Sequence, residues 1–216
     1  MIKRHRIFIA INLPFDIKKR LSDSQKKWPN LPARWIKSDN LHITLAFLGY
    51  LTDGELGEVC ITVKKVAERH SPFEINLNKI AYGPVGEKSP RPPKFLNNSE
   101  HQIKQENTNQ KFGRPRMVWI NGKRSKDLSD LKVDLENILS ESIRFKPEKR
   151  SFNIHITLAR LKQLEFKSLE LEERPEIDEN IDLTFAVESI DVMESVLRRT
   201  GPQYTILESF DLKNET

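Results

Sequence analysis

The chain has 216 residues, with 36 lysines and arginines against 31 aspartates and glutamates, and its formal net charge is +5 at pH 7. No apolar run approaches the roughly 18–20 residues of a transmembrane helix, so we expect no membrane contact. A single cysteine, Cys60, excludes an intramolecular disulfide and favours the reducing cytoplasm. The length is enough to bury a substantial core, and the positive charge favours a polyanionic partner without requiring one.

The first part of the chain alternates between strand and helix patterns. Pro14 fits the first position of a helix, because its missing N–H costs nothing there. Asp53 is predicted to cap a second helix, since an apolar stripe with helical spacing follows it. In chain order, strands are expected at 6–13, 41–48 and 73–80, and helices at 14–28 and 53–69.

The last part of the chain repeats this alternation. Ser125 or Asp127 is predicted to cap a helix that continues to about Ile143. Strands are expected at 116–121, 154–158, 185–196 and 203–210. Strands that alternate with helices in two similar halves predict an α+β fold of two lobes related by a pseudo-two-fold axis, with a cleft between their sheets.

One long segment, 87–113, interrupts the second half of the pattern. It is rich in proline and polar residues and has little apolar periodicity. We expect a flexible insertion that lies passively on the surface. A substrate lid is the alternative, because the insertion and its border carry Lys94, Lys104, Lys111 and Arg114.

The most informative feature is a pentapeptide, His-Ile-Thr-Leu-Ala, that occurs twice. The first motif is 42–46 and the second motif is 155–159. Both lie in apolar, β-branched runs that predict buried strands, so each histidine shares a face with the threonine two residues later. Two such strands side by side would bring two imidazoles and two hydroxyls together. That set suits general acid–base chemistry on an anion near neutral pH.

Each histidine taken alone is more often a packed or solvated residue than a catalytic one. Core packing, however, does not explain why the same His-x-Thr spacing occurs twice. The motifs lie 113 residues apart, which is far longer than the roughly 20–50 residues of a solenoid repeat. Duplication of a half-domain is therefore the better explanation.

With their flanking residues, the two motifs resemble the paired signatures of the two-histidine (2H) phosphoesterases. More narrowly, the chain is similar to the bacterial and archaeal RNA 2′,3′-cyclic phosphodiesterases, formerly called 2′-5′ RNA ligases. The similarity extends over nearly the whole chain. It is carried by the segments 6–14, 33–36, 40–49, 114–119 and 152–160.

The resemblance implies a single domain over 1–216, with a two-lobed duplicated α+β fold. In this fold antiparallel sheets flank a central cleft, with helices on the outside. It also implies hydrolysis of RNA 2′,3′-cyclic phosphate ends to 2′-phosphates. We expect neither a metal nor another cofactor, because no ligand cluster and no glycine-rich phosphate loop is visible in the sequence.

The resemblance also implies roles for individual residues. His42 would be the proton donor and His155 the proton acceptor, although the residues alone would allow the reverse. Thr44, Thr157 and Arg160 would hold the phosphate through hydrogen bonds and fixed positive charge. Two further candidates for contact with a base or a phosphate are Phe47 and Arg34. For Phe47, an aromatic core residue is the alternative.

Other functions stay open at this point. The same site could support a 2′-5′ RNA ligase or phosphodiesterase, or it could act on small 2′,3′-cyclic nucleotides. A non-catalytic module that binds RNA ends is the alternative from another class. The expected partner is RNA with 2′,3′-cyclic phosphate ends, with tRNA fragments as candidates, and we expect a cytoplasmic monomer.

Overall fold

The computed structural model describes residues 3–84, 115–147, 152–199 and 201–213. The predicted insertion at 87–113 lies outside these residues. In the described part the strands form one nine-stranded sheet of antiparallel pairs, in the order β7-β4-β5-β6-β3-β1-β8-β9, with β2 paired to β6. The strands are β1 (His5–Asn12), β2 (Ala33–Trp35), β3 (His42–Leu51), β4 (Phe73–Gly83), β5 (Met117–Gly122), β6 (His155–Leu161), β7 (Asp178–Val187), β8 (Ser189–Arg198) and β9 (Gly201–Asp211).

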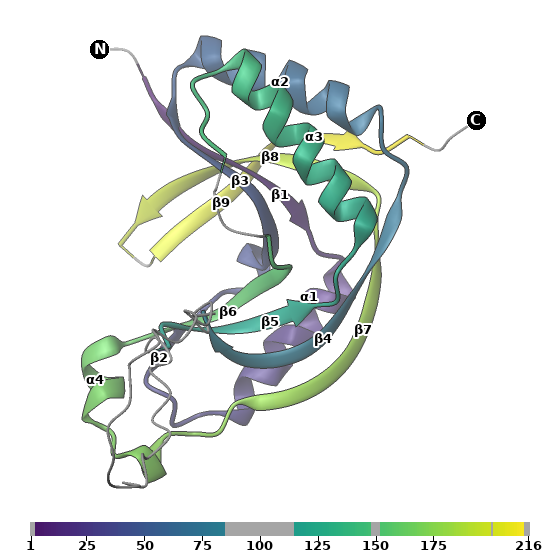
Figure 1. Ribbon diagram of the computed structural model, residues 1–216. Coiled ribbons are helices and arrows are strands. Elements are labelled where there is room, and N and C mark those ends of the chain that lie inside the picture. Colours follow the sequence, from purple (N-terminus) through teal and green to yellow (C-terminus); the bar gives the residue numbers. More distant parts are fainter. Residues whose placement is uncertain (1–2, 85–114, 148–151, 200, 214–216) are drawn as a thin grey trace, which may run out of the picture.

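Four α-helices and three 3₁₀ turns complete the described chain. Figure 1 shows α2 and α3 side by side on one half of the molecule, while α4 lies beyond the end of β6. The helices are α1 (Phe15–Ser24), α2 (Asp53–Ala67), α3 (Lys126–Ser142) and α4 (Gln163–Ser168), and the 3₁₀ turns are Gln25–Lys27, Ser38–Asn40 and Leu171–Glu173.

The sheet consists of two halves that meet at a single residue pair. One half holds β3, β1, β8 and β9, and the other holds β6, β5, β4 and β7. Between them, β3 and β6 share only the pair Ile43 and Ile156. Figure 1 shows the two halves curving away from this junction. The α+β class and the duplicated arrangement of antiparallel strands are thus confirmed, and the two predicted sheets are joined into one.

The main core lies between the sheet and the helices. Ile7, Ile9 and Ile11 of β1 point into it and are at most 1% exposed. The alternate residues Phe8 and Ala10 are also buried, but they pack with Met193 and the half-buried Tyr204 on the opposite face. On this opposite face the packing is between side chains of neighbouring strands of the sheet itself.

Three local predictions were wrong. Pro14 is the N-cap of α1 and not its first residue, because its backbone is extended and its carbonyl accepts from the N–H of Lys18. The N-cap of α2 is Thr52 and not Asp53, because Thr52 and Glu55 form a reciprocal capping box that satisfies two backbone N–H groups. The single strand predicted over 185–196 is divided at Glu188 into β7 and β8, which lie at different places in the sheet. For α3, Ser125 is the cap, with its hydroxyl accepting from the N–H of Leu128.

Candidate active site

The junction between the two halves places the motif side chains on one face. Ile43 and Ile156 face each other across an antiparallel pair, and both are fully buried in the core. Side chains alternate along a strand, so the neighbours of these isoleucines point to the other face. Those neighbours are His42, Thr44, His155 and Thr157, and all of them are half-buried.

Both histidines are oriented by the same backbone contact. Nδ1 of His42 lies 2.7 Å from the carbonyl oxygen of Asn40, and Nδ1 of His155 lies 2.8 Å from that of Asn153. A carbonyl only accepts, so Nδ1 carries the proton in each ring and Nε2 is free to give or take the second one. Asparagine precedes both motifs by two residues, although the contact uses only its backbone.

His42 lies in a closed aromatic environment. Its ring centroid is 5.1 Å from that of Phe8 and 5.3 Å from that of Tyr204, and its Nε2 is 2.9 Å from the hydroxyl of Thr44. Burial lowers the pKa of His42 to about 4, although the Asn40 carbonyl opposes this change. The positive charges of Lys18 and Arg160 lower this pKa further. In the free protein His42 is therefore neutral at pH 7.

His155 lies on an open aromatic surface. Its ring stacks on Trp119 with centroids 4.1 Å apart and an angle of 29° between the planes. A Cβ on Gly83 would lie 2.4 Å from a Trp119 ring atom, so only glycine leaves room for this indole. Among the described residues, Nε2 of His155 has no hydrogen-bond partner. Sequence reasoning missed Trp119 and Gly83, because their roles come from contacts between strands.

A β-bulge follows each histidine at the same position of the motif. In β3 the pairing with β1 skips Leu45, and in β6 the pairing with β5 skips Leu158. A bulge of one residue reverses the alternation of the side chains that follow it. The free carbonyl of Leu45 accepts from the Lys132 ammonium at 3.0 Å, and that of Leu158 accepts from the N–H of Ile36 at 3.0 Å.

The bulges bring Phe47 and Arg160 onto the face of the histidines. Each lies five residues after its histidine, so simple alternation would place it on the core side. Instead, Phe47 is opposite Phe8, and Arg160 is opposite Met117, which shares a face with Trp119. Phe47 is 68% exposed and Arg160 is also exposed. The two residues are pseudo-symmetric equivalents, with an aromatic ring in one half and a guanidinium in the other.

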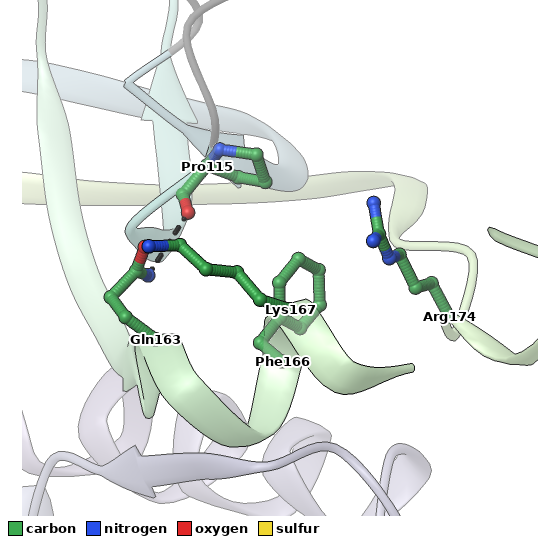
Figure 2. A pocket seen from close by; sticks show the side chains of 5 residues that line it. All are labelled: Pro115, Gln163, Phe166, Lys167 and Arg174. Atoms are coloured by element: carbon green, nitrogen blue, oxygen red, sulfur yellow. Dashed lines mark hydrogen bonds between the residues drawn. The ribbon is translucent and has the colours of Figure 1, made fainter. Parts of the chain in front are cut away.

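Arg34 reaches the same face from β2, where it lies directly opposite Arg160. A separate hollow near α4 is lined by Pro115, Gln163, Phe166, Lys167 and Arg174 (Figure 2), and it contains none of the predicted site residues. Over the described ranges, no three His, Cys, Asp or Glu side chains are grouped so that they could hold a metal ion. No described helix is both long and apolar enough to cross a membrane.

Comparison with known proteins identifies relatives of the whole chain. Residues 11–93 and 118–204 match the model of the LigT-like phosphoesterases. An RNA 2′,3′-cyclic phosphodiesterase of Geobacillus stearothermophilus is 29% identical over 217 residues, which cover 98% of this chain but 58% of that protein. Another of the same name, from Methanocaldococcus jannaschii, is 25% identical over 206 residues, covering 95% of this chain and 99% of that protein.

Solved structures agree with the fold. A crystal structure of a Thermus thermophilus protein superimposes with a TM-score of 0.72 at 25% identity, covering 98% of this chain and all of the other. Escherichia coli LigT in complex with 3′-AMP superimposes with a TM-score of 0.68 at 23% identity, again covering 98% of this chain and all of the other. At this identity the LigT likeness concerns the fold alone.

Proposed function

The chain belongs to the LigT-like phosphoesterase family, and from this premise we propose that it hydrolyses RNA 2′,3′-cyclic phosphate ends to 2′-phosphates. One observation carries the proposal. The pairing of Ile43 with Ile156 puts two His-x-Thr motifs on one face, with Nδ1 of each imidazole held by a carbonyl. Relatives across the chain's length bear the name RNA 2′,3′-cyclic phosphodiesterase.

The reaction needs a base, an acid and a site for charged oxygens. In the proposed assignment, His155 takes a proton from water and the resulting hydroxide attacks phosphorus. The bond from phosphorus to O3′ breaks, and His42 gives its proton to O3′, so the phosphate remains on O2′. Thr44, Thr157 and Arg160 hold the non-bridging oxygens during this step.

The proposed role of His42 depends on the bound phosphate. An imidazole with a pKa of about 4 is almost entirely neutral at pH 7, so its Nε2 carries no proton to donate. A phosphate anion in contact with it favours the charged form and raises this pKa, as an opposite charge does within a few ångströms. Substrate binding would thus charge the donor, and the phosphate would replace Thr44 as the partner of Nε2.

Phe47 offers a place for the terminal base. Its exposed ring lies on the histidine face, and an exposed aromatic ring can stack on a base of any identity. We propose that the enzyme acts as a monomeric single domain in the cytoplasm, on RNA ends such as those of tRNA fragments. The positive net charge supports a polyanionic substrate.

Product analysis tests the activity directly. An oligoribonucleotide with a 2′,3′-cyclic end and 2′,3′-cyclic AMP are incubated with the protein, and the 2′- and 3′-phosphate products are separated. Accumulation of the 2′-phosphate is expected. Binding of the oligonucleotide without turnover would favour a non-catalytic module for RNA ends. Joining of a 5′-hydroxyl RNA to the cyclic end would favour a 2′-5′ ligase.

A change of leaving group tests the two roles. A p-nitrophenolate leaving group needs no proton, so loss of the acid costs little with a p-nitrophenyl phosphodiester. His42→Ala is expected to lose much less activity on this substrate than on a cyclic phosphate, whereas His155→Ala loses similar activity on both. The opposite pattern would reverse the assignment.

A further inference from the structure

Two arginines lie directly opposite each other beside the second motif. β2 pairs antiparallel with β6, and Arg34 faces Arg160 in register. Directly opposed residues point to the same face of a sheet, with their Cβ atoms about 4.5–5.5 Å apart. Both side chains are exposed, so two guanidinium groups share one small area of surface.

This arrangement is unfavourable unless an anion binds there. Like charges directly opposite each other destabilise a strand pair. Within the described part of the chain, no acidic side chain forms an ion pair with Arg34 or Arg160. Arg69, by contrast, has Asp134 at 3.3 Å. Among the described residues, the two opposed guanidinium groups therefore have no acidic partner that offsets their charge.

The two arginines lie on the same face of the sheet as the histidines. The bulge at Leu158 turns Arg160 onto the face of His155 and Thr157, and the N–H of Ile36, just after β2, satisfies the carbonyl of that bulge. The same contact therefore fixes both the bulge and β2. Neighbouring strands lie about 4.8 Å apart, so Arg34 lies one strand to the side of Arg160, and its strand β2 pairs with the strand that carries His155.

We propose that these arginines form a site for two successive phosphates of an RNA end, an inference that rests on the proposed function. Arg160 holds the reacting cyclic phosphate, and Arg34 holds the phosphodiester on its 5′ side. A guanidinium binds phosphate oxygens in a bidentate manner, which suits both positions. A 2′,3′-cyclic mononucleotide has no second phosphate, so Arg34 makes the enzyme select oligonucleotide ends.

The test compares two substrates in Arg34→Ala. The value of KM for a cyclic-ended oligoribonucleotide is expected to rise roughly tenfold, the effect of one lost charge-assisted contact. The rise for 2′,3′-cyclic AMP should be at least fivefold smaller. Arg34→Lys keeps the positive charge but loses the bidentate geometry of the guanidinium. It should therefore raise KM for the oligoribonucleotide less than Arg34→Ala does. The matched control is Arg144→Ala, which removes an exposed arginine just beyond α3.

Salt dependence gives a second readout that a merely structural change would not alter. Each contact between a protein and a phosphate of a single strand contributes about 0.7 to the slope of log affinity against log salt. Arg34→Ala should reduce this slope by about that amount for the oligonucleotide, whereas Arg144→Ala should leave it unchanged. An unchanged slope in Arg34→Ala would overturn the proposal.

The other outcomes are equally decisive. Equal losses on both substrates would overturn the proposal, because Arg34 would then not distinguish a second phosphate, and no loss on either would show that Arg34 is only solvated. If the unaltered protein hydrolyses neither substrate, the proposed function fails. The two-phosphate site is then tested by binding of a 2′-phosphorylated trinucleotide and of 2′-AMP. A selective loss of trinucleotide affinity in Arg34→Ala supports the site, and an unchanged ratio of affinities rejects it.

Discussion

The first and second motifs have the same five residues but opposite surroundings. His42 is enclosed by Phe8 and Tyr204, and its Nε2 is engaged by Thr44. His155 stacks on Trp119 and leaves its Nε2 without a partner among the described residues. A duplicated motif thus supplies two equal groups, and the strands beside it make them unequal.

Much of the difference comes from the neighbouring strand in each half, although Tyr204 is contributed by β9. Asn12 lies opposite His42 in β1, and Asn121 lies opposite His155 in β5, so the two strands are equivalent. Opposite the threonines, however, β1 has Ala10 and β5 has Trp119. The tryptophan supports its histidine from one side, while the alanine leaves space that other aromatic rings fill. The proposed acid–base catalysis would benefit, because it needs two imidazoles in different protonation states.

Removal of either imidazole should have the largest effect. His42→Ala and His155→Ala are each expected to lower kcat by about 10²–10⁴, the usual contribution of a general acid or base. The double variant should lose far less than the product of the two losses, because the two groups act in one step. Steady-state kinetics on a cyclic phosphate measures this. Near-normal turnover by either folded single variant would contradict the two-histidine mechanism.

Acid should destabilise the first motif in particular. The pKa of His42 is about 4 in the folded protein and about 6.5 when unfolded. Between these values the unfolded state binds more protons, so stability is lost as pH falls from 6.5 towards 4. The loss is about 3 kcal/mol at 1.36 kcal/mol per pKa unit. Denaturant unfolding between pH 6.5 and 4 should show a larger loss in the free energy of unfolding for the wild type than for His42→Gln. Parallel pH profiles for the two proteins would contradict it.

The bulges can be distinguished through their partners. Lys132 is 8% exposed, donates to the carbonyl of Leu45 and forms an ion pair with Glu136. Lys132→Met should reduce the free energy of unfolding by about 1–3 kcal/mol, because a buried carbonyl and a carboxylate lose their partner. The carbonyl of the second bulge accepts from the backbone N–H of Ile36, so Lys132→Met should not affect that bulge. Lys126→Met is the control, since Lys126 and its partner Asp130 are exposed. Equal stability of both variants would contradict this role of Lys132.

The smallest effect is expected when the stacking of Trp119 on His155 is removed. Trp119→Leu should lower kcat/KM by roughly 3- to 10-fold, since an aromatic pair contributes about 0.5–1.5 kcal/mol. Trp119→Phe should retain most of the activity.

Gly83→Ala should reproduce the loss, because its Cβ must displace the indole. Gly54→Ala is the matched control, since a Cβ there meets nothing within 4 Å. Full activity in both Trp119→Leu and Gly83→Ala would show that the stacking does not position His155.

Much of this comparison could be predicted from the sequence, but its asymmetry could not. The repeated motif and the periodicity of β1, β3, β6, α2 and α3 predicted the fold class, because these elements bury regular apolar faces. The short strand β2 was missed, since three residues carry no measurable period. The bulges were missed as well, because they depend on cross-strand register, and without them Phe47 and Arg160 would be assigned to the wrong face. Trp119 was read only as part of a strand.

The most direct test of the unequal roles is a pH titration of His42 by NMR, in the free protein and with inorganic phosphate bound. His42→Gln serves to assign the signal. We predict a midpoint near 4 in the free protein and a clear upward shift when phosphate binds, because the anion stabilises the imidazolium. A midpoint near the ordinary value of about 6.5 in the free protein, or no shift with phosphate, would contradict the proposal that substrate binding charges the proton donor.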